Sequence, residues 1–198
     1  MNVNQFLAAS LLTISALGGC SSAPKQDGAA GPRVSEATYE SLINKNTRHH
    51  VEYDGFYNKF ELSTTFLNSD VQTTILQKRS DTLGWDNATA QKERERLFQE
   101  NSTQVKFFMS FFSPTPRLND LHKGSSIWKI YLEVEGKRYE GKVTKYKGKL
   151  EDIQAIYPYH TRWAMPFEVV FLVPLSGVEN HSPVFMITST QGSAKLQF

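Results

Sequence analysis

The chain has 198 residues, which is enough for one substantial hydrophobic core and too few for several large domains. Hydrophobic residues make up 39% and charged residues 21%, a globular balance that excludes collagen-like, coiled-coil and wholly disordered proteins. The 22 lysines and arginines nearly balance the 20 acidic residues, so no global positive field indicates a nucleic-acid partner.

The N-terminus carries a mostly apolar segment, residues 6–17, of the length of a signal-peptide core and too short to span a membrane. Leu17-Gly18-Gly19-Cys20 follows it and contains the single cysteine of the chain. This motif resembles the lipobox of bacterial lipoproteins. The resemblance implies cleavage before Cys20, acylation of Cys20 and attachment to a membrane through palmitate-type acyl chains. Ser21 after the cysteine is similar to outer-membrane sorting signals, so we expect a lipid-anchored protein of the bacterial outer membrane.

The alternative for Cys20 is a free thiol beside a buried N-terminal helix, which fits the signal-like core less well. Residues 20–35 are rich in Ala, Gly, Pro and Ser and predict a flexible tether. All aromatic residues except Phe6 lie at or beyond Tyr39. We therefore predict a signal peptide over 1–19, a lipidated cysteine and tether over 20–35, and one β-rich domain over 36–198. Once Cys20 is acylated, no cysteine is left for a disulfide or a thiolate site.

Ser35 and Glu36 suit the start of a short helix. Strand-like segments over 47–53 and 59–67 flank the turn signal Asp54-Gly55. The region 69–101 lacks strand alternation and predicts two helices that meet near Gly84. Polar residues suited to cap these two helices are Asn68, Ser69 and Asp86.

The remaining segments are strand-like, and the clearest alternates Trp128, Ile130, Leu132 and Val134 on one face. Further predicted strands cover residues 103–112, 126–134, 138–146, 167–173, 184–189 and 194–198, with a loop or short helix around 150–156. Seven or eight strands with a helical excursion predict a β-rich α+β fold. We expect an antiparallel β-sandwich or a partly open barrel with a helical insertion around residues 69–101.

The densest group of potential metal ligands is His49, His50, Glu52 and Asp54. On an extended strand His50, Glu52 and Asp54 point to the same face, where an imidazole and carboxylates could bind zinc. The candidate ligands named from this face are His50 and Glu52. Ligands along one strand are nearly in line, however, so a tetrahedral site needs a further ligand from another element. Histidines that could supply one are His122, His160 and His181. A solvent-facing strand edge is the favoured interpretation, and we predict no metal or other cofactor.

A second candidate is the basic segment around the predicted strand 138–146, which we consider for contact with an anionic envelope polymer or lipid headgroups. Its cations are Lys137, Arg138, Lys142, Lys145, Lys147 and Lys149. Lysines on an edge strand also keep it soluble and unpaired. Because charged residues alternate along the segment, we favour this solubility role.

The third candidate concentrates aromatic and polar side chains in seven residues, and we choose it as the possible ligand or partner surface. Its members are Tyr157, Tyr159, His160, Arg162 and Trp163. A loop folded over the core is the commoner role for such a segment.

Catalytic signatures are missing, because the sequence contains neither Gly-x-Ser-x-Gly nor His-Glu-x-x-His. We assign no catalytic residue and expect a non-enzymatic envelope lipoprotein that binds or scaffolds a protein or an envelope polymer. One alternative is an envelope hydrolase for glycan or peptide with His160 as acid or base. Another is a metal-binding module that uses His50 and Glu52. No resemblance to a family extends over residues 36–198.

Overall fold

The computed structural model describes residues 34–198. The predicted signal peptide, Cys20 and the tether up to residue 33 lie outside the described residues. Within 34–198 the chain forms, in order, α1 (Glu36–Lys45), β1 (Thr47–Asp54), β2 (Tyr57–Phe66), α2 (Ser69–Leu83), α3 (Asn87–Asn101), β3 (Val105–Phe112), β4 (Lys129–Val134), β5 (Lys137–Glu140), β6 (Lys142–Lys145), α4 (Leu150–Ile156), β7 (Met165–Phe171), β8 (Val184–Ser189) and β9 (Gly192–Gln197). Two short 3₁₀ turns, Pro116–Asn119 and Leu175–Gly177, connect strands.

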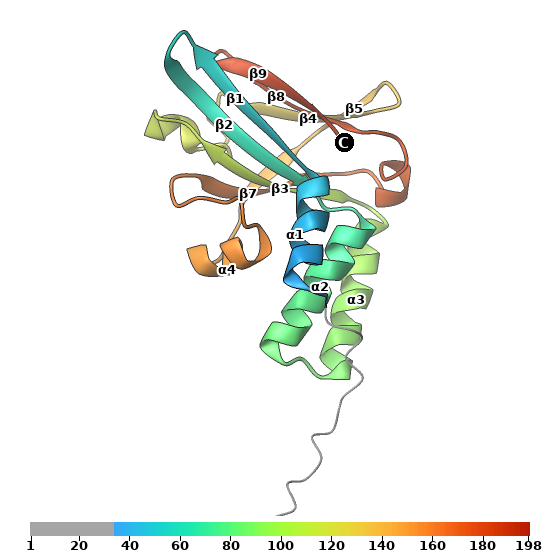
Figure 1. Ribbon diagram of the computed structural model, residues 1–198. Helices are drawn as coiled ribbons and strands as arrows, with labels where there is room; N and C mark the ends of the chain where they lie inside the picture. Colours follow the sequence, from blue (N-terminus) through green and yellow to red (C-terminus); the bar gives the residue numbers. More distant parts are fainter. Residues whose placement is uncertain (1–33) are drawn as a thin grey trace, which may run out of the picture.

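The strands form two antiparallel sheets (Figure 1). The five-stranded sheet has the order β1-β2-β3-β7-β6, and the four-stranded sheet has the order β5-β4-β8-β9. Every neighbouring pair is antiparallel. The predicted β-rich α+β fold with a helical insertion is therefore confirmed.

The two helices of the insertion begin at capping residues predicted from the sequence. The side chain of Asn68 accepts a hydrogen bond from the amide of Val71 at the start of α2, and Asp86 accepts one from Thr89 at the start of α3. Hydrogen bonds from the side chain and the backbone amide of Thr89 hold the pKa of the Asp86 carboxyl below its usual value. Gly84 ends α2 in the left-handed conformation that favours glycine. In Figure 1, α2 and α3 project from the sheets at the end opposite the tip of the β1–β2 hairpin.

The prediction of one strand over 138–146 is wrong, because this segment divides at Gly141 into β5 and β6. The two halves belong to different sheets, which raises the strand number to nine in the described part of the chain. At the corner, the amide of Gly141 donates to the carbonyl oxygen of Ile130 at 2.8 Å. A Cβ on Gly141 would lie 2.8 Å from Phe171 and 2.9 Å from Val169. The corner therefore has room only for glycine.

The opposite edges of the two sheets also meet, at β1 and β9. The Arg48 guanidinium donates to the carbonyl oxygen of Gln197 at 2.8 Å. At the other end of β9, Gly192 lies against the side chains of Glu52 and Phe60. The two sheets thus approach a closed barrel. On one side the chain passes from β5 to β6 at Gly141, and on the opposite side, side-chain contacts join β1 to β9.

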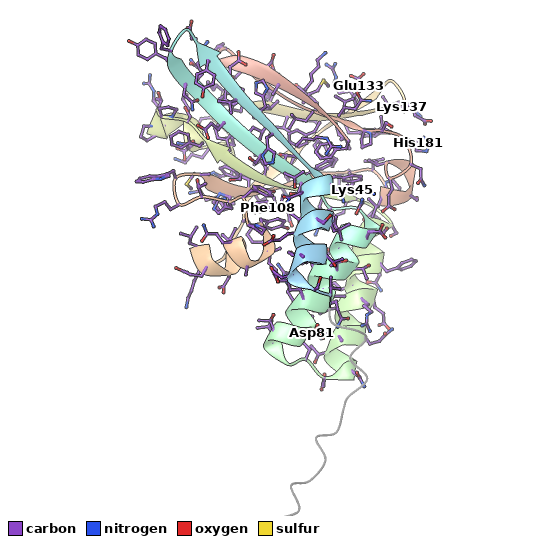
Figure 2. All side chains as sticks on the ribbon, viewed as in Figure 1. Lys45, Asp81, Phe108, Glu133, Lys137 and His181 are labelled. Carbon is purple, nitrogen blue, oxygen red and sulfur yellow. The ribbon has the colours of Figure 1, made fainter. Side chains whose placement is uncertain are left out.

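Two hydrophobic cores lie on the two faces of the five-stranded sheet. The larger core fills the space between the sheets and contains the predicted inward face of β4 together with Phe107, Met109 and Phe111 of β3. The smaller core lies beneath α1, α2 and α4 and contains Phe108, which points from the other face of β3 (Figure 2). No helix within residues 34–198 is long and apolar enough to cross a membrane.

Candidate functional site

Tyr157, the first aromatic residue of the segment chosen from the sequence, belongs to the smaller core. Its ring is buried and stacks on Phe108, with ring centroids 3.6 Å apart and ring planes 4° from parallel. Burial raises the pKa of the Tyr157 phenol well above its usual value. This side chain is therefore a packing residue without access to a partner.

Tyr159 is partly buried at the rim of the same core. Its hydroxyl forms a 2.5 Å hydrogen bond with Thr65, and its ring meets the His49 ring edge to face at 5.6 Å. Burial raises the pKa of the Tyr159 phenol. These contacts fix Tyr159 against β1 and β2, so its hydroxyl is occupied within the fold.

His160 is also buried, and its Nδ1 lies 2.8 Å from the hydroxyl oxygen of Ser110. A hydroxyl beside an imidazole is the arrangement of a nucleophile and its base. Both side chains lie in the interior of the protein, however, and no described carboxylate forms a hydrogen bond with the other imidazole nitrogen. The geometry of the pair is that of a satisfied buried hydrogen bond.

Burial lowers the pKa of His160, so the folded protein holds it neutral where the unfolded chain, with a histidine pKa of about 6.5, takes up a proton. Stability must then decrease as the pH falls through about 6.5. We expect the free energy of unfolding of the wild type to drop more between pH 7 and pH 5 than that of His160→Gln, by at most about 1.4 kcal/mol per pH unit. Urea unfolding across this pH range measures the difference. Burial also lowers the pKa of His49, but His49 is present in both proteins and its contribution cancels in the difference. Equal loss of unfolding free energy in the wild type and His160→Gln would therefore contradict a contribution from His160.

Arg162 and Trp163 are the two members of the segment that reach solvent. Trp163 is 71% exposed, and Arg162 is exposed beside it. The structure therefore separates the five chosen residues into three that pack inside the fold and two on the loop before β7.

The proposed metal ligands His50 and Glu52 do lie on one face of β1, with His50 Nε2 at 3.0 Å from a carboxylate oxygen of Glu52. Asp54 instead faces Lys59 at 3.8 Å. Within residues 34–198, no three His, Cys, Asp or Glu side chains are grouped so as to hold a metal ion. His50 and Glu52 are a hydrogen-bonded pair without a third ligand from another described element.

The basic segment is divided between the two sheets at Gly141. Lys137 and Arg138 follow the β4–β5 turn, and Lys137 lies opposite Val134 in the register of this hairpin. Arg138 pairs with Glu133 at 3.3 Å. Lys142 and Lys145 lie on β6, at the edge of the five-stranded sheet. All six cations are exposed, including Lys147 and Lys149 before α4. Exposed lysines on an edge strand discourage pairing with another strand.

The sequence analysis missed the most exposed aromatic surface, the tip of the β1–β2 hairpin, which we call the aromatic tip and define as Tyr53, Phe56 and Tyr57. Phe56 is fully exposed, Tyr57 is 81% exposed and Tyr53 is 59% exposed. The strand register shifts between Glu52 and Tyr53, and Gly55 turns the chain with φ at 60°. The signal in the sequence was the presence of three aromatic residues at a predicted hairpin turn. Side chains at such a turn lie at the end of the sheet.

Comparison of the chain with protein-family models, with curated proteins and with solved structures finds no match.

Proposed function

We propose that this chain is a non-enzymatic, membrane-anchored envelope lipoprotein that binds another protein through the aromatic tip. The observation that carries the proposal is the exposure of Tyr53, Phe56 and Tyr57 at the end of a well-paired hairpin. Large aromatic side chains are enriched at protein interfaces because each buries much apolar area with few rotatable bonds. Burial of one such ring is worth about 1.5–3 kcal/mol.

The charges around the aromatic tip favour a protein over an anionic membrane as the partner. Glu52, Asp54 and Glu61 lie on the strands next to the tip, and Lys59 is the single cation among the residues 51–61. Aromatic segments that bind anionic membrane surfaces carry basic residues on their polar side. The tip suits an apolar pocket with a basic rim on another protein.

The expected anchor would keep the tip near its partner. Acyl chains on Cys20 would confine the domain to a membrane surface, and confinement raises the local concentration of a partner in the same envelope. From Cys20 to the first described residue, Val34, an extended chain spans roughly 50 Å, so the domain would have a wide reach.

The test is crosslinking in cells that express the tagged chain, followed by identification of crosslinked proteins by mass spectrometry. In the variant Tyr53→Ser/Phe56→Ser/Tyr57→Ser we expect partner recovery to fall at least about tenfold, since each exposed ring contributes binding energy on this scale. The melting temperature should stay within about 2 °C of the wild type, because none of the three rings belongs to either core.

Trp163→Ser is the matched control, because it also removes an exposed aromatic side chain but from the loop before β7. It should leave partner recovery unchanged. A Cys20→Ala chain tests the anchor and should lose the partner through mislocalisation. Full recovery with the triple variant would contradict the proposal. Loss of recovery with Trp163→Ser alone would also contradict it and would move the binding surface to the 157–163 segment.

A further inference from the structure

The helical side of the five-stranded sheet carries a cleft of about 310 Å³. Figure 1 shows two of the elements that line it, α2 and α4, away from the turn of the β1–β2 hairpin. The cleft lies between the C-terminal half of α2, helix α4 and the segment that joins β6 to α4. Its apolar lining consists of Leu83, Ile153, Ala155 and Ile156. Because Ile153 and Ile156 belong to the smaller core, the floor of the cleft is continuous with a packed interior. The volume lies at the lower end of the range of small-molecule sites.

Arg79 forms the polar end of this cleft. It is half-buried, and its Nη2 donates a 2.6 Å hydrogen bond to the hydroxyl of Tyr146. Tyr146 is held in place by edge-to-face contacts with Phe108 and Tyr157. Within residues 34–198, no carboxylate pairs with Arg79, and its guanidinium makes no other hydrogen bond to protein. A guanidinium has five N–H donors, so most of its donors are free for a ligand.

A half-buried guanidinium loses hydration, and among the described residues the Tyr146 hydroxyl replaces only part of it. An anion beside Arg79 would restore these interactions, and the planar guanidinium matches the two oxygens of a carboxylate. An apolar tail of the same molecule would cover the floor formed by Ile153 and Ile156. The site therefore combines a position for an anion at Arg79 with an apolar groove over Ile153 and Ile156, which we call the trough.

The charge around the cleft indicates a single negative charge on the ligand. Lys78, Arg79, Lys147 and Asp152 line it. Lys78 is already paired with Glu36 at 2.7 Å. After this pair and the Asp152 carboxylate are counted, one positive charge remains in excess. A carboxylate carries one negative charge, whereas a phosphate monoester carries about 1.5 to 2 at neutral pH, so the carboxylate is the better match.

We infer that this cleft binds a free fatty carboxylate, with the head group on Arg79 and Tyr146 and the acyl chain along α4. Tyr146 accepts the hydrogen bond from Arg79, and its own hydroxyl hydrogen is available to a carboxylate oxygen. The inference is independent of the aromatic tip and adds a small-molecule site to the chain.

The probe is dodecanoate, titrated below its micelle concentration by calorimetry into the purified full chain with Cys20→Ser, so that no acyl chain of the protein competes. We expect saturable binding at one site. Arg79→Gln should weaken it at least about tenfold, because hydrogen bonds to charged groups are among the strongest in proteins. Ala155→Trp, at an exposed position on the cleft wall, should abolish binding by filling the trough. The matched control Arg162→Gln removes an exposed guanidinium outside the cleft and should bind as the wild type does.

Three further ligands test separately the need for the charge, for the alkyl chain and for a single negative charge. Dodecanol has the chain without the charge, acetate has the charge without the chain, and dodecyl phosphate has a larger charge. All three should bind more weakly than dodecanoate. Absence of dodecanoate binding, or binding unchanged by Arg79→Gln and Ala155→Trp, would overturn the site. Tighter binding of dodecyl phosphate would overturn the assignment to a carboxylate.

Discussion

Phe107→Ala is expected to lower the free energy of unfolding by about 3–5 kcal/mol, the range for loss of a buried phenylalanine. Phe107 lies on β3, the central strand of the five-stranded sheet, and has no exposed surface. Its ring meets Phe66 at 4.9 Å, Phe185 at 5.2 Å, Phe198 at 5.3 Å and Phe171 at 5.8 Å. These partners come from both sheets, so the alanine variant leaves a cavity where the two sheets meet.

Urea unfolding at neutral pH measures this loss, and Phe56→Ala is the matched control. Phe56 is the same residue type at full exposure, and its replacement should change the free energy of unfolding by no more than about 0.5 kcal/mol. If the two variants lost similar stability, the larger core would not be organised around β3.

Phe108→Ala is also expected to lower the free energy of unfolding by about 3–5 kcal/mol. The part of the protein that loses stability should differ from that in Phe107→Ala. Phe108 points to the other face of β3 (Figure 2), where it stacks on Tyr157 and meets Tyr146 edge to face at 5.3 Å. These rings connect α4 and the segment before it to the sheet. We expect Phe108→Ala to destabilise residues 146–160, which include α4, more than the packing between the two sheets.

Amide hydrogen exchange followed by mass spectrometry distinguishes the two variants. In Phe108→Ala, exchange should increase in α4 and the 146–160 segment more than in β4 and β8, which pack in the other core. In Phe107→Ala, the increase should include β4 and β8. An equal increase in both regions for Phe108→Ala would mean that the two faces of the sheet unfold as one unit.

Local patterns in the sequence were sufficient for most of the fold. The alternation from Trp128 to Val134 predicted the inward face of β4, and the caps Asn68 and Asp86 predicted the starts of α2 and α3. These features depend on residues close together in the chain, where strand period and backbone hydrogen bonding act directly.

Features that depend on distant residues could not be predicted in this way. Gly141 turns between sheets because Phe171 and Val169, far along the chain, come close to it. The sequence left two roles open for the aromatic segment around Tyr157, a partner surface or a loop folded over the core. The stacking of the Tyr157 ring on Phe108 of β3 places this ring in the core. The contact of Arg79 with Tyr146 likewise joins residues 67 positions apart. None of these pairings leaves a periodic signal.

Site-specific photocrosslinking shows whether the aromatic tip contacts a protein partner in the cell. A photoreactive phenylalanine analogue would replace Phe56 in one strain and Phe98, which is 77% exposed on α3, in another. We expect a discrete protein adduct from position 56 that is absent from position 98 and lost with Cys20→Ala. No adduct at position 56, or the same adducts from both positions, would contradict the proposed contact.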